Sequence, residues 1–345
     1  MIGKDKTQLY IFYHVIIIKT IMLLGIFVGT ISIGFSQDPQ FSQFYAASMY
    51  LNPAFTGNTI QHRLMGIYRN QWPSVGKAFV SSSFSYDQNL TDLNSGLGII
   101  FTQDKAGTGG LRYTNIGGLY AYYFQINKKL MARFGTKFSY TFRNYDLSKL
   151  RFNDQIITGS PATIESLEQG VSYPDFAGGG LLYSEKFWVG IAFDHLNQPN
   201  QSFIYENTPL PIKSSLHGGY KFIIDERDAQ EEHGKSVTVA ANYKAQEKWD
   251  QIDLGAYFNR NPFTLGIWYR GIPIFKRYKA GYSNNDAIIL LLGVQSKRMK
   301  IGYTYDITIS KLNNNTGGSH EIAIIYEYDK KKRKRKKFFV PCAKF

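Results

Sequence analysis

The chain has 345 residues, 16 % of them aromatic, and a formal net charge of +14. Its mean hydropathy of −0.26 is too polar for a bundle of transmembrane helices, and its length fits two domains or one large all-β barrel. The eight consecutive Lys or Arg residues of Lys330–Lys337 carry more than half of the net charge, so the charge does not indicate nucleic-acid binding. The single cysteine, Cys342, excludes an intramolecular disulfide and a cysteine-based metal cluster.

An apolar run at residues 20–35 has the length of a signal-peptide core. Lysines precede it, and a small and a polar residue follow it. We predict a signal peptide at residues 1–37, with cleavage near Gln37, and therefore an exported protein. Two alternatives remain open at this stage. A second apolar stretch before the run favours an N-terminal transmembrane anchor, and translation that starts at Met22 would remove that stretch.

The rest of the chain alternates between apolar and polar side chains with a period of two, which is typical of strands with one apolar face. In Lys129–Arg143, one face carries Phe134 and Phe138, and the other carries Arg133 and Lys137. We count about fourteen such strands, each near the nine to eleven residues that a tilted membrane strand needs. Their predicted centres lie near Ile67, Ser82, Ile99, Gly118, Thr136, Gly179, Gly190, His217, Ala240, Leu254, Ile267, Leu291, Tyr305 and Ile324.

Loop lengths favour a membrane barrel over a soluble sandwich. Tight turns are expected at Gln125–Lys128, Ser184–Lys186, Asn259–Pro262 and Ser296–Met299. Longer connections alternate with them, at Asn144–Tyr173, Asn197–Pro211, Gly271–Asn284 and Lys311–Ser319. Outer-membrane barrels have short periplasmic turns and longer outer loops, although Asp225–Lys235 and Pro73–Gly76 depart from this pattern.

The charges on the polar faces also favour a barrel. Arg133, Lys137 and Arg143 share one strand face, and they would be costly in the dry core of a sandwich. We expect a hydrated lumen to hold them at little cost. The predicted fold is an all-β, transmembrane, antiparallel outer-membrane β-barrel at residues 62–329, preceded by a short periplasmic segment at residues 38–61 and followed by a basic periplasmic tail at residues 330–345.

Two motifs follow the leader. Gln37–Tyr45 reads QDPQFSQFY, and Tyr50–Gly57 reads YLNPAFTG. Together they closely resemble the N-terminal hallmark of the PorP/SprF family of outer-membrane proteins. Gly317–Ile322 resembles the last hairpin of that family, and Pro341–Phe345 resembles its short terminus that contains a cysteine.

The resemblance implies a role in type IX secretion, the pathway for gliding motility and surface-protein export in Gram-negative bacteria. Family members assist the secretion or surface anchoring of partners that bear a conserved C-terminal sorting domain, or connect the barrel to other type IX secretion components and periplasmic proteins. The expected partners are therefore such proteins and outer-membrane lipid, and not nucleic acid. The alternative is a passive channel, or porin, for small solutes. No Ser, His and Asp set stands in motif form, so we do not expect an enzyme.

Residues 38–61 carry an unusual number of aromatic side chains for a linker. Asn52-Pro53 prevents a helix from continuing through this segment. We predict that the segment folds into or under the periplasmic mouth of the barrel, as a plug or as a docking strap for a partner. The residues predicted to do so are Gln40, Phe41, Phe44, Tyr45, Asn52, Pro53, Phe55 and Gly57. A plain linker before the first strand is the alternative.

Other features of the sequence carry weaker predictions. The six histidines do not stand at metal-ligand spacing, and we expect no metal and no cofactor. Gly178-Gly179-Gly180 lies inside a predicted strand, which favours relief of strand curvature or a close approach of the N-terminal segment. The basic tail either docks on an acidic periplasmic protein or on peptidoglycan, or it only adds solubility. Its predicted docking residues are Lys330, Lys332, Arg333, Arg335 and Lys337.

Overall fold

The computed structural model describes residues 38–75, 79–107, 110–146, 153–159, 170–203, 206–224, 235–272, 277–279, 282–310 and 316–329. Residues 40–345 form one compact unit, and residues 1–39 form another. The predicted signal peptide and basic tail, residues 1–37 and 330–345, lie outside the described residues, as do residues 225–234 of the connection between β8 and β9.

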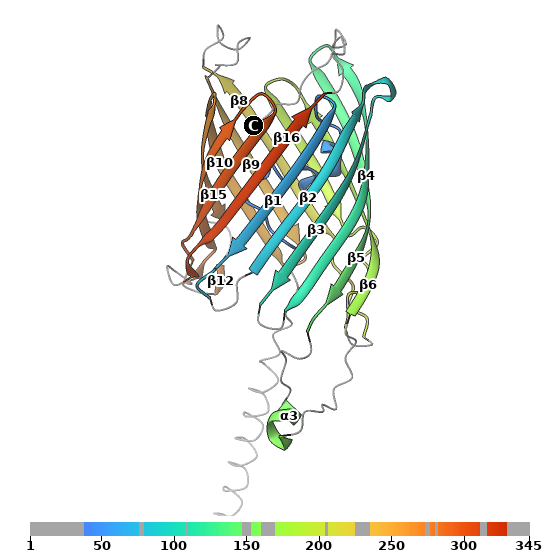
Figure 1. The fold of residues 1–345 in the computed structure, drawn as a ribbon, viewed down its shortest axis with the longest axis vertical. Coiled ribbons are helices and arrows are strands. Elements are labelled where there is room, and N and C mark those ends of the chain that lie inside the picture. The colour runs from blue at the N-terminus through green and yellow to red at the C-terminus, as the bar shows by residue number, and fades with distance from the viewer. Residues whose placement is uncertain are drawn as a thin grey trace, which may run out of the picture. The chain divides into compact units, whose positions relative to one another are not determined.

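Fourteen strands in the described part of the chain close into an antiparallel barrel (Figure 1). They are β1 (His62–Gln71), β2 (Phe79–Leu90), β3 (Ser95–Ala106), β4 (Leu111–Asn127), β5 (Leu130–Asn144), β6 (Gly170–Tyr183), β7 (Phe187–Asp194), β8 (Lys213–Ile223), β9 (Lys235–Gln246), β10 (Trp249–Arg260), β11 (Phe263–Gly271), β14 (Asn285–Gln295), β15 (Met299–Thr308) and β16 (Ser319–Tyr328). Each predicted strand centre lies inside one of them, and the predicted fold class is confirmed.

Each barrel strand pairs with its neighbours in sequence, and β1 pairs with β16 to close the ring. This seam runs from His62 opposite Tyr328 to Gln71 opposite Ser319 without a bulge. Closure pairs the edge strands with each other, so strand amides and carbonyls are satisfied within the sheet, as the interior of a lipid bilayer requires. The small elements between the barrel strands are η2 (Thr91–Leu93), α3 (Asn153–Thr158) and the hairpin of β12 (Arg277–Lys279) and β13 (Tyr282–Ser283).

The two ends of the barrel differ in their connections. We call the end where β4 joins β5, β6 joins β7, β10 joins β11 and β14 joins β15 the tight-turn end; it is uppermost in Figure 1. The other end, which we call the long-loop end, carries the 144–170, 194–213 and 271–285 connections. The tight turn at Glu247–Lys248 and the four-residue connection between β3 and β4 also lie at the long-loop end, and they add two exceptions to the two expected from the sequence.

The outer face of the barrel is a belt of apolar side chains. In β5, Phe134, Phe138 and Phe142 are exposed together with the other even-numbered residues from Phe134 to Asn144, whereas the odd-numbered residues between them point inward and are buried inside the barrel. The same alternation places Ile99, Ile191 and Leu265, among many others, on the outer face. In water such a surface would be unfavourable, but it matches the hydrocarbon layer of an outer membrane. Among the described residues, no helix is long and apolar enough to cross a membrane.

Candidate functional site

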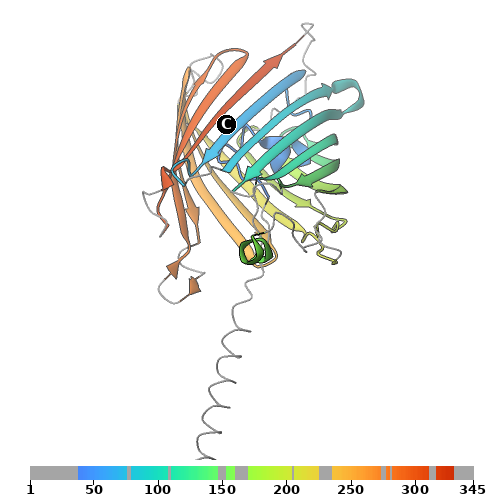
Figure 2. The same cartoon turned by 60° about the horizontal axis from the view of Figure 1, so that its bottom comes forward.

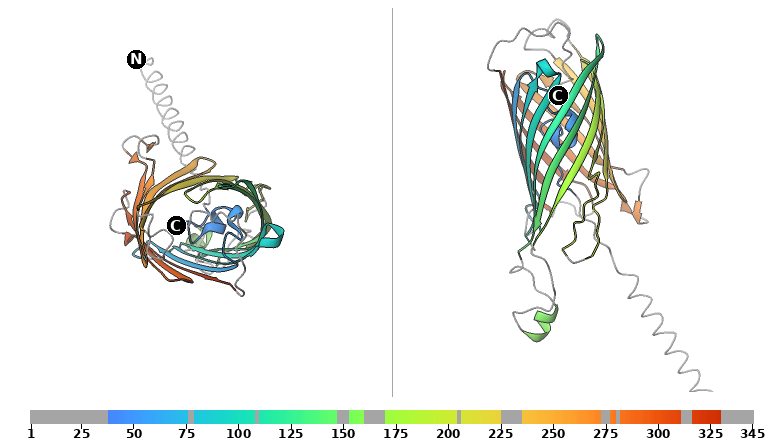
Figure 3. Two further views of the ribbon diagram at one scale, coloured as in Figure 1. Left: turned by 90° about the horizontal axis from the view of Figure 1, so that it is seen from above. Right: turned by 90° about the vertical axis from the view of Figure 1, so that its right-hand side faces the viewer.

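The barrel lumen is occupied by the chain that precedes β1. We call residues 40–57 the luminal segment; it contains the short helices α2 (Ser48–Leu51) and η1 (Pro53–Phe55). Figure 2 and the left view of Figure 3 show it in blue inside the ring of strands. Gln43 and Asn52 have exposed fractions of 0 %, and Phe41 and Phe55 are almost as deeply buried. A linker in solvent would leave such side chains exposed.

The sequence predicts a segment that folds into or under the periplasmic mouth of the barrel; in the structure the segment lies inside the lumen and is not confined to one mouth. Gly57 lies near the tight-turn end, where its amide donates to Asp87 of β2 over 2.7 Å. Ser42 lies near the opposite end, where its hydroxyl donates to Asp306 of β15 over 2.7 Å. The segment therefore extends along the lumen from one end of the barrel to the other.

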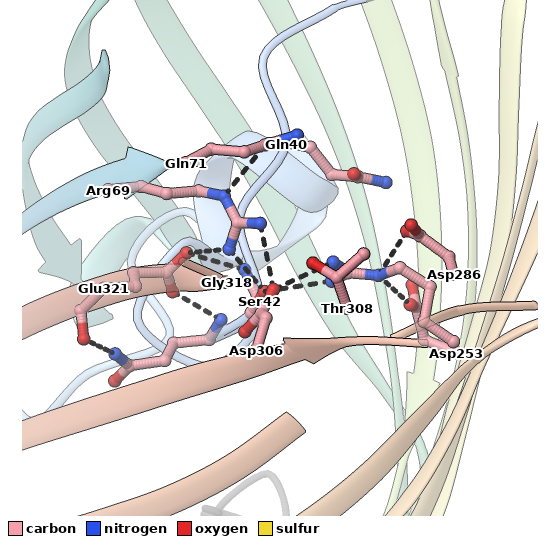
Figure 4. Close-up of polar contacts among 12 residues, drawn as sticks. Gln40, Ser42, Arg69, Gln71, Asp253, Asp286, Asp306, Thr308, Gly318 and Glu321 are labelled. Atoms are coloured by element: carbon pink, nitrogen blue, oxygen red, sulfur yellow. Dashed lines mark hydrogen bonds and ion pairs between the residues drawn. The ribbon is translucent and has the colours of Figure 1, made fainter. Parts of the chain in front are cut away.

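A buried cluster of charged and polar groups holds the first residues of the luminal segment (Figure 4). We call it the anchor cluster; its members are Ser42, Arg69, Asp253, Arg270, Asp306 and Glu321. The two guanidinium groups share Asp306, at 2.9 Å from Arg69 and 3.1 Å from Arg270. Arg69 also lies 3.3 Å from Glu321, and Arg270 lies 2.8 Å from Asp253. Both arginines donate to the hydroxyl oxygen of Ser42, at 2.7 and 3.0 Å.

Glu321 also binds the backbone of the luminal segment. Its carboxylate accepts hydrogen bonds from the amides of Ser42 and Gln43, at 2.8 and 2.7 Å. The side-chain amide of Gln43 donates to the backbone carbonyls of Gly302 and Glu321, at 3.4 and 3.2 Å. These hydrogen bonds fix the backbone of the luminal segment as well as its side chains. They join the segment to β15 and β16.

Asn52 fixes the middle of the luminal segment. Its backbone is extended, as is usual before proline, and its Oδ1 accepts from the amide of Ala54 over 2.9 Å, which caps η1. Its Nδ2 lies 3.1 Å from the carbonyl oxygens of Gly180 and Ile191 and from Nε2 of His217. One amide group thus caps η1 and joins it to β6, β7 and β8.

Replacement of Asn52 is expected to destabilise the barrel, and aspartate should lower the stability more than alanine. Asn52→Ala removes the cap and the side-chain donor to two buried carbonyls, at a cost of roughly 1–3 kcal/mol. Asn52→Asp should cost more, because a carboxylate would face the carbonyl oxygens of Gly180 and Ile191. Chemical unfolding of the barrel in lipid vesicles measures both changes. Asn144→Asp, at an exposed position of β5, is the matched control and should have little effect. An Asn52→Asp barrel as stable as the Asn52→Ala barrel would contradict the donor role.

The last part of the luminal segment is held by two further arginines. Arg133 of β5 donates to the carbonyl oxygen of Ala54 over 2.9 Å and also to that of Thr56. Arg63 of β1 donates to the carbonyl of Phe55 over 3.2 Å and forms an ion pair with Asp87 at 2.8 Å. Both arginines are buried. The sequence predicted that Arg133 would face a hydrated lumen; instead, it is buried against the luminal segment.

The lumen is also more apolar than the sequence predicted. Two clusters of buried apolar side chains join the wall to the luminal segment. Phe44 packs edge-on against Trp268 at 5.3 Å, and Phe55 stacks on His217 at 5.4 Å. The second cluster surrounds Phe41 and includes Met65 of the wall. Burial of these side chains stabilises the segment inside the barrel, because it removes apolar area of the wall from water.

Glycines of the wall make room for the luminal segment. A Cβ at Gly135 would lie 2.3 Å from the carbonyl carbon of Pro53, and one at Gly96 would lie 2.3 Å from the carbonyl oxygen of Thr56. A Cβ at Gly179 would lie 2.2 Å from Oδ1 of Asn52. Of the two uses considered for the triple glycine, Gly179 therefore serves the close approach of the N-terminal segment.

All eight residues named for the N-terminal segment lie inside the barrel wall. Of these, Phe41, Phe44, Asn52, Pro53, Phe55 and Gly57 are buried, and Gln40 and Tyr45 are partly buried. Their role in binding a partner remains a prediction. The five residues named for the basic tail, Lys330, Lys332, Arg333, Arg335 and Lys337, lie outside the described residues.

Asp194 and His195 are neighbours in the sequence but have separate contacts in the structure. Asp194 bridges Lys137 and Lys213 at 3.0 and 3.2 Å, whereas His195 lies 3.0 Å from Asp175. Across the described ranges, no group of three His, Cys, Asp or Glu residues is arranged to hold a metal ion.

Sequence reasoning missed the partners of the luminal segment. The charged members of the anchor cluster come from β1, β10, β11, β15 and β16, and each stands on the inner face of its strand. Charges at inward positions were visible in the alternating pattern, but the pattern does not show which of them meet. One further signal was available: Ala287–Val294 of β14 is apolar on both faces, and the inner face of such a strand needs an apolar partner.

A closed antiparallel barrel with an apolar outer belt, short turns at one end and long loops at the other is a transmembrane barrel of the outer membrane. The model of the type IX secretion system membrane protein family PorP/SprF matches residues 33–326. The chain belongs to this family. The family and the fold are those of a membrane barrel for secretion or transport, and not those of an enzyme class.

Solved outer-membrane proteins resemble the structure at low sequence identity. The toluene transporter TodX of Pseudomonas putida is 10 % identical, with a TM-score of 0.46, over 81 % of this chain and 93 % of that chain. The toluene transporter TbuX of Ralstonia pickettii is 11 % identical, with a TM-score of 0.45, over 82 % and 94 %. The outer membrane protein Omp33 of Acinetobacter baumannii is 8 % identical, with a TM-score of 0.41, over 79 % and 100 %. No curated protein matches the sequence.

Proposed function

We propose that this outer-membrane barrel assists the secretion or the surface anchoring of a partner protein, as part of the type IX secretion and gliding machinery. Membership of the PorP/SprF family implies association with that machinery. The observation that supports a protein-handling role over solute transport is the luminal segment. A passive channel needs a continuous wet path, and here buried side chains such as Phe44, Phe55 and Trp268 pack across part of the lumen.

Two surfaces are proposed to serve this role. The barrel ends carry the turns and loops that a partner reaches without entering lipid, and a secreted partner with a C-terminal sorting domain would meet the long-loop end. Periplasmic components would meet the tight-turn end, where Lys128, Lys129, Lys186 and Arg298 are exposed. The basic tail Lys330–Lys337 is proposed to add to the docking of an acidic periplasmic protein or of peptidoglycan. The luminal segment is proposed to close the lumen and to support the wall.

Purification from native membranes in mild detergent, followed by mass spectrometry, tests the proposed function. We expect a large surface protein with a C-terminal sorting domain, or type IX secretion components, to co-purify with the barrel. An unrelated outer-membrane barrel purified from the same membranes is the control.

Conductance in planar bilayers tests the alternative function. We expect the purified protein to show no steady open channel, because the luminal segment fills part of the lumen and is held by buried ion pairs. A barrel that is purified alone and conducts small ions steadily would contradict the proposal and favour the porin alternative.

A further inference from the structure

We infer that the luminal segment threads the barrel outward, so that Gln40 faces the cell exterior, and that it is a fixed part of the barrel core and not a removable plug. This inference goes beyond the proposed function. It rests on the fold and on the contacts of the segment, and it holds whether or not a partner protein binds.

Contacts near the tight-turn end locate the last residues of the segment. Gly57 donates to Asp87, three residues before the end of β2, and it packs against Gly96, the second residue of β3. The strand ends at this position are joined by the short connection Thr91–Asn94. Residues 58–61 then lead directly into β1, which starts at the same end of the barrel.

Contacts near the long-loop end locate the first residues. Ser42 bonds to Asp306, two residues before the end of β15, and to Arg270, one residue before the end of β11. Gln40 donates to Gln251, two residues after the start of β10 at the same end. Two residues of strand correspond to about 7 Å, so Gln40 and Ser42 lie close to the rim. Figure 4 shows Gln40 beside the anchor cluster.

The orientation of the barrel sets the direction relative to the cell. Outer-membrane barrels place short turns in the periplasm and longer loops outside. Four tight turns lie at one end here, and the 144–170 and 271–285 connections lie at the other. Gln40 therefore lies at the exterior end, which is opposite to the periplasmic placement that the sequence predicted for this segment.

The contacts of the segment oppose its removal. Withdrawal would leave Glu321 without two amide donors and would leave Arg133 without the carbonyls of Ala54 and Thr56. It would also expose the apolar wall around Trp268 and Ile289. The β1–β16 seam closes the ring of strands, and residues of β1, β5 and β16 hold the segment inside that ring. The segment is therefore part of the folded core of the barrel.

Labelling of single cysteines on intact cells tests the direction. Gln40→Cys is introduced after Cys342→Ser has removed the native cysteine, and cells are treated with a charged maleimide dye too large to pass porins. Ile157→Cys, on α3 in the 144–170 connection, has an exposed fraction of 84 % and is the exterior control. Lys128→Cys, in the exposed β4–β5 turn, is the periplasmic control.

We expect Gln40→Cys and Ile157→Cys to be labelled on intact cells, and Lys128→Cys to be labelled only after the outer membrane is permeabilised. Labelling of Gln40→Cys only after permeabilisation, or only after unfolding, would overturn the outward threading. Labelling of Lys128→Cys on intact cells would overturn the assigned orientation. Hydrogen exchange of the purified barrel tests whether the luminal segment is a fixed part of the core. If the amides of Ser42 and Gln43 exchange as fast as those of exposed turns, the segment is not fixed and this part of the inference is overturned.

Discussion

Replacement of Arg270 by methionine is expected to cost roughly 3–5 kcal/mol of stability, the range for breaking a buried ion pair from one side. The side chain of Arg270 is 1 % exposed, and its guanidinium group lies between Asp253 at 2.8 Å and Asp306 at 3.1 Å. Methionine fills a similar volume but neutralises neither carboxylate. Asp306 keeps Arg69 at 2.9 Å, so the larger loss falls on Asp253, whose other cation, Lys244, is 3.7 Å away.

The prediction is checked by guanidinium-induced unfolding of the refolded barrel in lipid vesicles, followed by tryptophan fluorescence. Arg298→Met is the matched control, since its side chain is 62 % exposed and lies 3.8 Å from Asp329. An exposed pair of that kind contributes at most about 1 kcal/mol. Adding Asp253→Asn to Arg270→Met should restore part of the lost stability, because it removes the carboxylate left without its arginine. If Arg270→Met unfolds like Arg298→Met, the anchor cluster does not hold the luminal segment.

Replacement of Gly135 by alanine should displace the luminal segment. The added methyl group would lie 2.3 Å from the carbonyl carbon of Pro53 and 2.4 Å from the amide nitrogen of Ala54. Both are backbone atoms, so no side-chain rotation relieves the overlap. We expect a loss of roughly 1–3 kcal/mol from overpacking, although alanine otherwise favours folding over glycine by reducing the freedom of the unfolded chain.

Gly118→Ala is the matched control for this change. Gly118 lies on the neighbouring strand β4, and a Cβ there would meet nothing within 4 Å. We expect this barrel to be as stable as the unmodified one, or slightly more stable. Unfolding midpoints, together with proteolysis of the luminal segment in the folded state, separate the two variants. Equal stability and equal protection of Gly135→Ala and Gly118→Ala would show that the segment does not lie against β5 at this position.

The alternation of apolar and polar residues along the sequence determined the strands of the barrel wall and the face on which each side chain lies. A strand shows its faces within its own residues, so Phe134 and Phe138 could be assigned to the outer face and Lys137 to the inner face from the sequence alone. Neighbouring strands pair in chain order, and loop lengths separate the two ends. The strand positions, the closed barrel and the outer membrane followed from these local signals, and the QDPQFSQFY and YLNPAFTG motifs led to the family.

Only the tertiary structure decided what fills the lumen and in which direction the chain runs through it. Ser42 and Asp306 are separated by 264 residues, and Asn52 and His217 by 165. Contacts of this kind form between inward side chains that strand tilt and ring closure place at the same height along the barrel axis. Period-two alternation shows which side chains point inward, but it does not show the height at which each of them lies. The sequence by itself therefore determined a barrel with a distinctive N-terminal segment, whereas the packed wall made that segment part of its core.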